Sequence, residues 1–249
     1  MTKKILSFIL CIAMCMGMVS MLSGCGGAKD AFVIMTEQLD EVTLIHVPGA
    51  TKELAKAKSE EMLRLVGIIP ENVYNAFPHE LSGGMRQRIC IARALSVNPK
   101  LVICDEPVSA LDVTIQAQII NLLKDLQRQM NLAYVFISHD LSVVKFISDK
   151  IGVMYLGAMM EFGTKEAIFQ NPLHPYTKAL FSAVPNPDPT AKMDRIKLEG
   201  DIPSPANPPK GCRFHTRCPY AKEICKHVPP VYKEYEEGHF AACHILDEE

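Results

Sequence analysis

Two short apolar runs separated by an amphipathic segment constrain the fold of this chain most strongly. The runs are "LVIC" (residues 101–104) and "AYVFI" (residues 133–137), and apolar residues recur at helical spacing between Val113 and Met130. Short, fully apolar runs are typical of parallel strands that are buried on both faces. A helix is expected near residues 140–149 and a further strand near 151–155, so the alternating order predicts an α/β layer fold.

Polar side chains follow both apolar runs. Asp105 and Glu106 come directly after the first run, and His139 follows the second. The carboxyl ends of parallel strands meet at one sheet edge, where open α/β sheets place their ligand chemistry. Asp105 suits a Mg²⁺ ion, directly or through water, Glu106 suits a general base that polarises a water, and His139 suits contact with a γ-phosphate. Taken separately, the two acids also fit a solvated turn, and a single histidine is as often structural.

A Ser-Gly-Gly sequence precedes the helix that we expect over residues 85–95. Ser82, Gly83 and Gly84 would offer a hydroxyl, backbone N–H groups and the positive end of a helix dipole to an anion. The alternative is an ordinary serine cap with glycines at a tight turn. A further helix is expected over residues 51–66, where helix-forming residues dominate.

Four motifs occur in a characteristic order, namely "LSGGMRQR" (81–88), "LVICDEP" (101–107), "SALD" (109–112) and "ISHD" (137–140). This order resembles the signature motif, Walker B strand, D-loop and switch histidine of ATP-binding cassette (ABC) ATPases. "NPLHPYTKALFSAVP" and "EGDIPSPANPPKGCRFHTRCPYA" are similar to the ATPases of oligopeptide and dipeptide importers, especially the second of their two ATPase subunits. The resemblance covers roughly residues 36–249.

The resemblance implies roles for individual residues. By it, Asp105 handles Mg²⁺, Glu106 is the general base, His139 contacts the γ-phosphate, Asp112 belongs to the D-loop at a dimer contact, and Ser82 to Gly84 bind nucleotide. ATP and Mg²⁺ are the implied cofactors. The implied partners are another ABC ATPase subunit in a homodimer or heterodimer, membrane permease subunits and a peptide-binding lipoprotein, at the cytoplasmic face of a bacterial membrane.

The phosphate-binding loop of that family, G-x-x-x-x-G-K-[ST], does not occur in the 249 residues. In this family one subunit holds ATP with its phosphate loop, and the signature motif of the other subunit covers it. The sequence therefore predicts an incomplete nucleotide-binding domain, made of the helical subdomain and the C-terminal part of the parallel-sheet core, that is inactive in ATP hydrolysis alone. The alternative is a non-catalytic partner that completes one composite ATP site.

The first 25 residues resemble a bacterial lipoprotein signal. Lys3 and Lys4 precede an apolar run, which ends in "LSGC" at Cys25, the residue that would carry the lipid. An uncleaved hydrophobic anchor is the other interpretation. Export would separate the chain from cytoplasmic ATP. Besides the ATPase subunit and the non-catalytic partner, a third interpretation is therefore an exported lipoprotein with a metal-binding C-terminal segment.

Composition changes near residue 172, since twelve of the seventeen prolines lie from Pro172 onward. We therefore expect three parts: the signal segment 1–25, the truncated ABC domain 26–171, and a loop-rich extension 172–249 with one short helix near 175–183. A net charge of −2 and 22% charged residues leave no basic face for nucleic acid.

The extension contains four cysteines that suit a metal, because a segment poor in apolar residues needs another source of stability. Their wide spacing favours a [4Fe-4S] cluster over zinc, and disulfides rank third. The resemblance adds that similar extensions can carry a four-iron cluster. Nearby His215, His239 and His244 are interpreted as surface residues. The four cysteines are Cys212, Cys218, Cys225 and Cys243.

Overall fold

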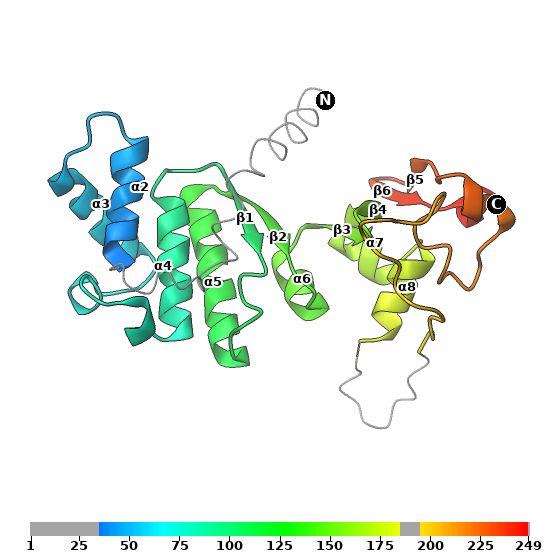
Figure 1. Cartoon of the computed structure of the whole chain (residues 1–249), viewed down its shortest axis with the longest axis horizontal. Coiled ribbons are helices and arrows are strands. Elements are labelled where there is room, and N and C mark those ends of the chain that lie inside the picture. The colour runs from blue at the N-terminus through cyan, green and yellow to red at the C-terminus, as the bar shows by residue number, and fades with distance from the viewer. Residues whose placement is uncertain (1–34, 185–194, 249) are drawn as a thin grey trace. The chain divides into compact units, whose positions relative to one another are not determined.

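The computed structural model describes residues 35–184 and 195–248 (Figure 1). The predicted signal segment, including Cys25, lies outside these residues. Contacts divide the chain into two compact units, Met1–Val143 and Val144–Glu249. This division precedes the change in composition at residue 172, which was the basis for the expected domain boundary.

The first unit consists of helices around a short parallel sheet. Its elements are α2 (Met35–His46), α3 (Lys52–Leu65), η3 (Pro70–Asn72), η4 (Pro78–Glu80), α4 (Gly83–Leu95), β1 (Leu101–Asp105), α5 (Val113–Met130) and β2 (Ala133–Ile137). The helix α6 (Leu141–Ile147) contains the division between the units.

The second unit contains a mixed arrangement of strands and short helices. Its elements are β3 (Lys150–Tyr155), β4 (Ala158–Thr164), α7 (Lys165–Gln170), α8 (Pro175–Ser182), α9 (Glu223–His227), β5 (Tyr232–Glu236), β6 (His239–Ala242) and η5 (His244–Glu248).

The strand–helix–strand unit that the sequence predicts is present in the first unit. Strands β1 and β2 pair in parallel from Leu101↔Ala133 to Asp105↔Ile137. Helix α5 connects them, and Asn131, in the left-handed conformation with φ 51°, ends it. The side chains that α5 buries follow the predicted helical period, and they are Ile119, Ile120, Leu123 and Leu126.

The prediction that both strands are buried on both faces is wrong for the described residues. In β1 only Cys104 is buried, and no residue of β2 is buried. The sheet has two strands within the described ranges. Each of them is therefore an edge strand, and Ile137 keeps 48% of its surface exposed.

Helices α2, α3 and α4 pack against one another beside this sheet (Figure 1). Asp40 of α2 accepts hydrogen bonds from Ser59 of α3 and from Tyr74. The carboxylate thereby ties α2 to α3 and to the segment that leads toward α4.

The second unit is built on an antiparallel sheet in the order β3-β4-β6-β5. The sequence predicted β3 as a further strand of the α/β layer, yet its partner is β4. Leu156 and Gly157 join the two strands with φ of 47° and 75°, which suits a two-residue hairpin turn. Because β4 also pairs with β6, residues 158–164 belong to the same unit as the extension.

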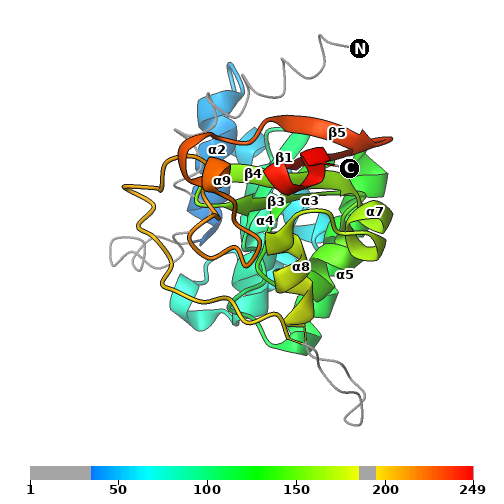
Figure 2. The same cartoon turned by 90° about the vertical axis from the view of Figure 1, so that its right-hand side faces the viewer.

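The proline-rich extension is more ordered than its composition suggests. It contributes β5, β6 and α9 in addition to the predicted short helix, which is α8. Figure 2 faces this unit, where α7 and α8 contact strands of the sheet. Phe214, which has no exposed surface, anchors a core with Tyr155 and Met160.

Candidate functional site

The structure brings Glu106 and His139 together at the carboxyl ends of β1 and β2. Nδ1 of His139 lies 3.0 Å from Oε1 of Glu106. Glu106 adopts φ 44°, and its N–H donates to the carbonyl of Ile137, so the chain turns sharply as it leaves the sheet. Both side chains are exposed. The hydrogen bond from His139 lowers the pKa of Glu106, so the carboxylate is ionised at neutral pH.

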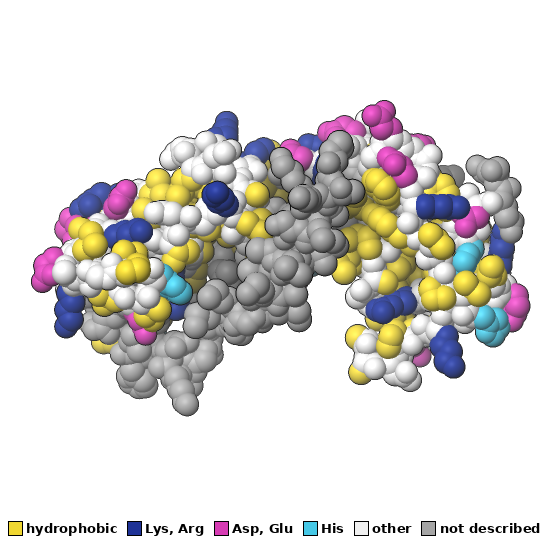
Figure 3. Space-filling view, turned by 90° about the horizontal axis from the view of Figure 1, so that it is seen from above, with side chains coloured by type: hydrophobic (Ala, Val, Ile, Leu, Met, Phe, Trp, Pro, Cys, Tyr) yellow, Lys and Arg dark blue, Asp and Glu magenta, His cyan; other side chains and the backbone are white. Residues whose placement is uncertain are grey.

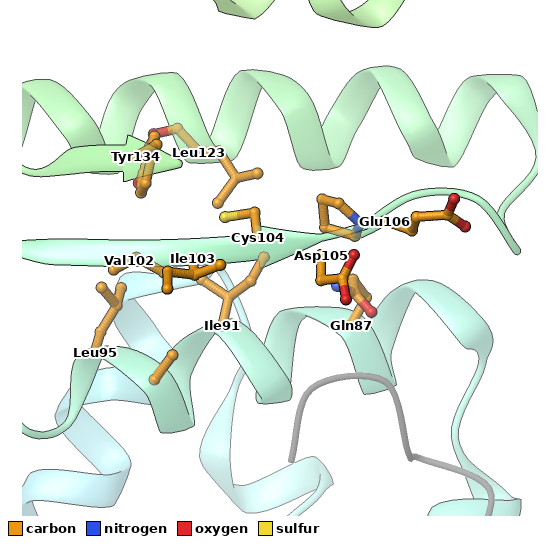
Figure 4. A pocket seen from close by; sticks show the side chains of 12 residues that line it. Gln87, Ile91, Leu95, Val102, Ile103, Cys104, Asp105, Glu106, Leu123 and Tyr134 are labelled. Carbon is orange, nitrogen blue, oxygen red and sulfur yellow. The ribbon is translucent and has the colours of Figure 1, made fainter. Parts of the chain in front are cut away.

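Asp105 is directed toward α4, whereas Glu106 lies further along the chain (Figure 4). Gln87 and Asp105 line a small cavity of about 50 Å³ between α4 and the sheet. Cys104 lines the same cavity, and burial raises the pKa of its thiol to about 12. The two adjacent acids therefore occupy different surroundings, as separate roles require. Gln87 is a neighbour of Asp105 that the sequence interpretation missed, because helical periodicity does not reveal which strand a helix residue faces.

Ser82 is the N-cap of α4, and its hydroxyl accepts a hydrogen bond from the N–H of Met85 at 3.3 Å. This is the capping role that was the alternative to anion binding. Gly84 lies against α5, since a Cβ atom at this position would be 2.8 Å from Cγ2 of Ile115. A Cβ at Gly83 would be 3.3 Å from Leu111. The two glycines therefore allow the start of α4 to approach the start of α5 closely.

Asp112 has the same local role for α5. Its Oδ1 accepts a hydrogen bond from the N–H of Ile115 at 3.0 Å. The capped starts of α4 and α5 are thus neighbours through Gly84 and Ile115. This juxtaposition of the Ser-Gly-Gly sequence with the "SALD" sequence was not evident from their positions in the chain.

The cysteines of the extension gather in one neighbourhood. Cys212, Cys225 and Cys243 are buried, Cys218 is half-buried, and all four are free thiols. Burial raises the pKa of Cys212, Cys218 and Cys243, and repulsion among neighbouring thiolates adds to it. No disulfide joins the described cysteines, so the structure gives the disulfide interpretation no support.

The metal predictions have no support from this arrangement. Across residues 35–184 and 195–248, no set of three or more His, Cys, Asp or Glu side chains is placed to hold a metal ion. Cys212 and Cys225 instead belong to the apolar core around Phe214, and Cys218 packs against this core.

The interpretation of His239 as a surface residue is wrong. His239 and Glu161 have fully buried side chains, and Nε2 of the histidine lies 2.8 Å from Oε1 of the carboxylate. Glu161 also accepts the N–H groups of Leu173 and His174 at 2.8 Å each. A carboxylate with three donors can be buried without a large penalty, and here it joins β4, β6 and the start of α8.

None of the helices in the described ranges combines the length and apolar character that a membrane span requires.

Comparison with known proteins agrees with the order of the motifs. Residues 29–109 match the "ABC transporter" family model, and residues 160–225 match "Oligopeptide/dipeptide transporter, C-terminal region". Oligopeptide transport ATP-binding protein AppF of Bacillus subtilis is 60% identical over 190 residues, which is 76% of this chain and 57% of AppF. Oligopeptide transport ATP-binding protein OppF of Haemophilus influenzae is 53% identical over 211 residues, 83% of this chain and 63% of OppF.

Among solved structures, the ADP conformation of an ATP-binding cassette of an ABC transporter aligns with a TM-score of 0.50 and 20% identity, covering 64% of this chain and 66% of that one. This likeness concerns the fold, which is the α/β fold of an ABC-ATPase nucleotide-binding domain. The chain spans little more than half the length of the curated relatives that it matches. In sequence, the chain is similar, over part of their length, to the oligopeptide transport ATP-binding proteins AppF and OppF.

Proposed function

We propose that this chain is an ATP-binding subunit of a peptide ABC importer, in which ATP binding and hydrolysis are coupled to oligopeptide or dipeptide uptake. The observation that carries the proposal is the Glu106–His139 contact at the ends of two parallel strands. A general base beside a γ-phosphate ligand is what hydrolysis of a phosphoanhydride by water needs. The match of residues 160–225 to the peptide-transporter extension supports the peptide class of substrate.

Within this proposal each residue has a distinct task. Where a phosphate-binding loop completes their own site, Glu106 would polarise the attacking water, His139 would contact the γ-phosphate, and Asp105 would hold Mg²⁺. When bound, Mg²⁺ would neutralise negative charge on the phosphate groups of ATP. Ser82, Gly83, Gly84 and Asp112 belong to the face that meets a partner ATPase, because they lie at the neighbouring starts of α4 and α5.

The signature face of this chain would act on ATP that a partner holds. The 249 residues contain no phosphate-binding loop, so in this proposal the backbone cradle and lysine that hold the β- and γ-phosphates lie outside these residues. In this proposal the 249 residues do not hydrolyse ATP alone. The remaining partners are membrane permease subunits and a peptide-binding lipoprotein, and nucleic acid is not among them. The complex would lie at the cytoplasmic face of the bacterial membrane.

A mixing experiment tests this proposal. Purified chain should show no ATP hydrolysis, and it should change the hydrolysis rate of an intact ATPase such as AppF of Bacillus subtilis. Ser82→Asp retains a side chain that caps α4 but places a carboxylate where the phosphates would approach, so it should abolish the effect. Ser82→Thr, which caps without added charge, is the matched control and should preserve it.

The same experiment separates the two faces of the chain. Glu106→Gln should leave the effect on AppF unchanged, because the proposed composite site uses the base of the partner. If the chain alone hydrolysed ATP and Glu106→Gln abolished this hydrolysis, the requirement for a partner would be contradicted. An unchanged rate of AppF with every variant would contradict the shared site.

A further inference from the structure

A groove in the second unit is separate from the residues assigned to nucleotide. It has a cavity volume of about 700 Å³ and lies between strands β4, β5 and β6 and two proline-rich loops. Sites for small ligands typically range from roughly 300 to 1,000 Å³. The groove therefore has room for a ligand of two or three amino-acid residues.

The walls of the groove are rigid. Pro208 and Pro209 line one side and Pro229 and Pro230 the other, and each proline ring fixes its own φ. Gly211 anchors the first wall, because a Cβ there would lie 2.4 Å from the carbonyl oxygen of Cys225, which also accepts the N–H of Cys212. A site whose walls are already fixed loses little conformational entropy when a ligand binds.

The four prolines of these walls contribute carbonyl oxygens as acceptors and no backbone donors. Proline has a carbonyl group but no N–H. Within the part of the chain that the structure describes, no donor is paired with the carbonyl oxygens of these four prolines. A ligand with N–H groups would complement the walls, whereas an acyl chain has none to offer.

The floor of the groove is apolar. The partly exposed Met159 of β4 and Tyr232 of β5 line the groove, as does Met160, which is only 2% exposed because it belongs to the Phe214 core. The ring of Tyr232 stacks on Phe240, with ring centroids 5.7 Å apart, and 44% of its surface remains exposed. Unbranched methionine side chains adapt to ligands of different shape. This floor therefore suits an aliphatic or aromatic side chain of variable size.

The charge of the lining is positive. Lys210, Arg213 and His227 line the groove, and no Asp or Glu does. Lys210 is exposed and pairs with no described acid, whereas His227 lies 3.2 Å from Glu223 outside the lining. Arg213 donates to the carbonyl of Leu156, which holds its guanidinium group in place. Figure 3 shows one face of this unit, where cationic and histidine side chains lie among apolar ones.

We propose that this groove binds a short peptide that has an apolar side chain and a free C-terminal carboxylate. The peptide N–H groups would donate to the proline carbonyls, its side chain would lie on Met159 and Tyr232, and its carboxylate would meet Lys210 and Arg213. The proposal assigns a peptide site to the second unit, and it does not depend on ATP hydrolysis by the first.

Calorimetry and methyl NMR on the full chain test the proposal, with the tripeptide Ala-Leu-Phe as the probe. The free acid should bind and shift the methyl signals of Met159 and Met160, assigned with Met159→Leu and Met160→Leu. The C-terminal amide of the same peptide should bind about threefold or more weakly, because it lacks the carboxylate. Lys210→Gln should reduce that difference, and the exposed Lys197→Gln, outside the groove, should preserve it.

Three results would overturn the proposal. The first is an absence of Met159 and Met160 shifts at millimolar peptide, and the second is equal binding of the acid and the amide. The third is octanoate binding with the same shifts as tightly as the peptide, which would make the ligand a simple acyl carboxylate. Circular dichroism of Lys210→Gln verifies that a loss of binding does not reflect unfolding.

Discussion

His139 lies 3.0 Å from Glu106 although 33 residues separate them in the chain. Their proximity follows from the parallel register of β1 and β2, in which Asp105 is opposite Ile137. Each of the two side chains leaves the sheet just beyond this last pair. Neither needs a specific long-range contact of its own, because the strand pairing places both at one edge.

Removing the histidine should therefore change the titration of the carboxyl group. In His139→Ala the pKa of Glu106 should rise toward its ordinary value, since the hydrogen bond to His139 is the main cause of its lowering. The carboxyl ¹³C signal of Glu106, followed by NMR against pH, measures this. His46→Ala, on the exposed end of α2, is the control. An unchanged Glu106 titration in His139→Ala would mean that the contact does not form in solution.

The sign of the associated stability effect follows from the direction of the shift. A carboxyl group whose pKa is lowered by folding stabilises the folded state above its ordinary pKa. This contribution is lost as pH falls through the lowered value. Because both side chains are exposed, His139→Ala should alter the titration far more than the free energy of unfolding.

Gly84 should not tolerate a side chain while Ile115 is present. In Gly84→Ala the new Cβ would lie 2.8 Å from Cγ2 of Ile115, so the two helices must shift. Overpacking of this kind typically costs about 1–3 kcal/mol, less the gain from better helix propensity. Denaturant unfolding measures the cost, and Gly83→Ala, with a 3.3 Å contact, should be milder.

The double variant identifies the contact responsible. Ile115→Ala removes the Cγ2 atom, so Gly84→Ala should cost less in that background than in the original chain. Equal costs in both backgrounds would show that the glycine matters for another reason, such as its backbone conformation.

Local sequence patterns located much of the first unit. The apolar runs gave β1 and β2, the helical period gave α5, and residues with capping side chains stand at Ser82 and Asp112. These signals are local, because a strand, a helix and its cap depend on residues within a few positions of one another. The proximity of Glu106 and His139 follows from the parallel pairing of β1 and β2.

The second unit depends on contacts that no local pattern reports. Glu161 and His239 are 78 residues apart, and nothing near His239 in the sequence distinguishes a buried histidine from an exposed one. The pairing of β4 with β6 likewise brings distant segments together. The composition change at residue 172 lies within this unit because proline content reflects loops and not sheet partners.

Burial should suppress the reactivity of the cysteine cluster. The pKa of Cys218 is raised to about 11, chiefly by burial, so its thiolate at pH 8 should be about 100-fold scarcer than in an ordinary thiol. Mass spectrometry after timed iodoacetamide treatment should show slow alkylation of Cys212, Cys218 and Cys243 and fast alkylation in urea.

Metal analysis of the same protein tests whether the four cysteines hold a metal. Iron, sulfide and zinc contents of protein purified without oxygen test the predicted metal site, for which the described side chains show no set of three or more ligands in place. Four iron and four sulfide per chain would support the [4Fe-4S] cluster that the sequence predicts. The four thiols would then be deprotonated, as ligands of a bound metal are.

The stability of the second unit should fall between pH 6.5 and pH 4 because of His174. Its side chain is 1% exposed, and burial lowers its pKa to about 4. Between this value and the ordinary value near 6.5 the unfolded chain binds a proton that the folded chain does not. The stabilisation from neutral His174 is therefore full above pH 6.5, and about 3 kcal/mol of it is lost as pH falls to 4.

His174→Asn isolates this contribution. Nδ1 of His174 accepts the N–H of Tyr176 and caps α8, and asparagine retains the ability to cap a helix while it does not titrate. Urea unfolding of both proteins at pH 7 and pH 4, followed by NMR signals of the second unit, should give a smaller pH difference for His174→Asn. An identical pH difference would mean that His174 takes up its proton without opening its surroundings, and that other groups cause the acid sensitivity.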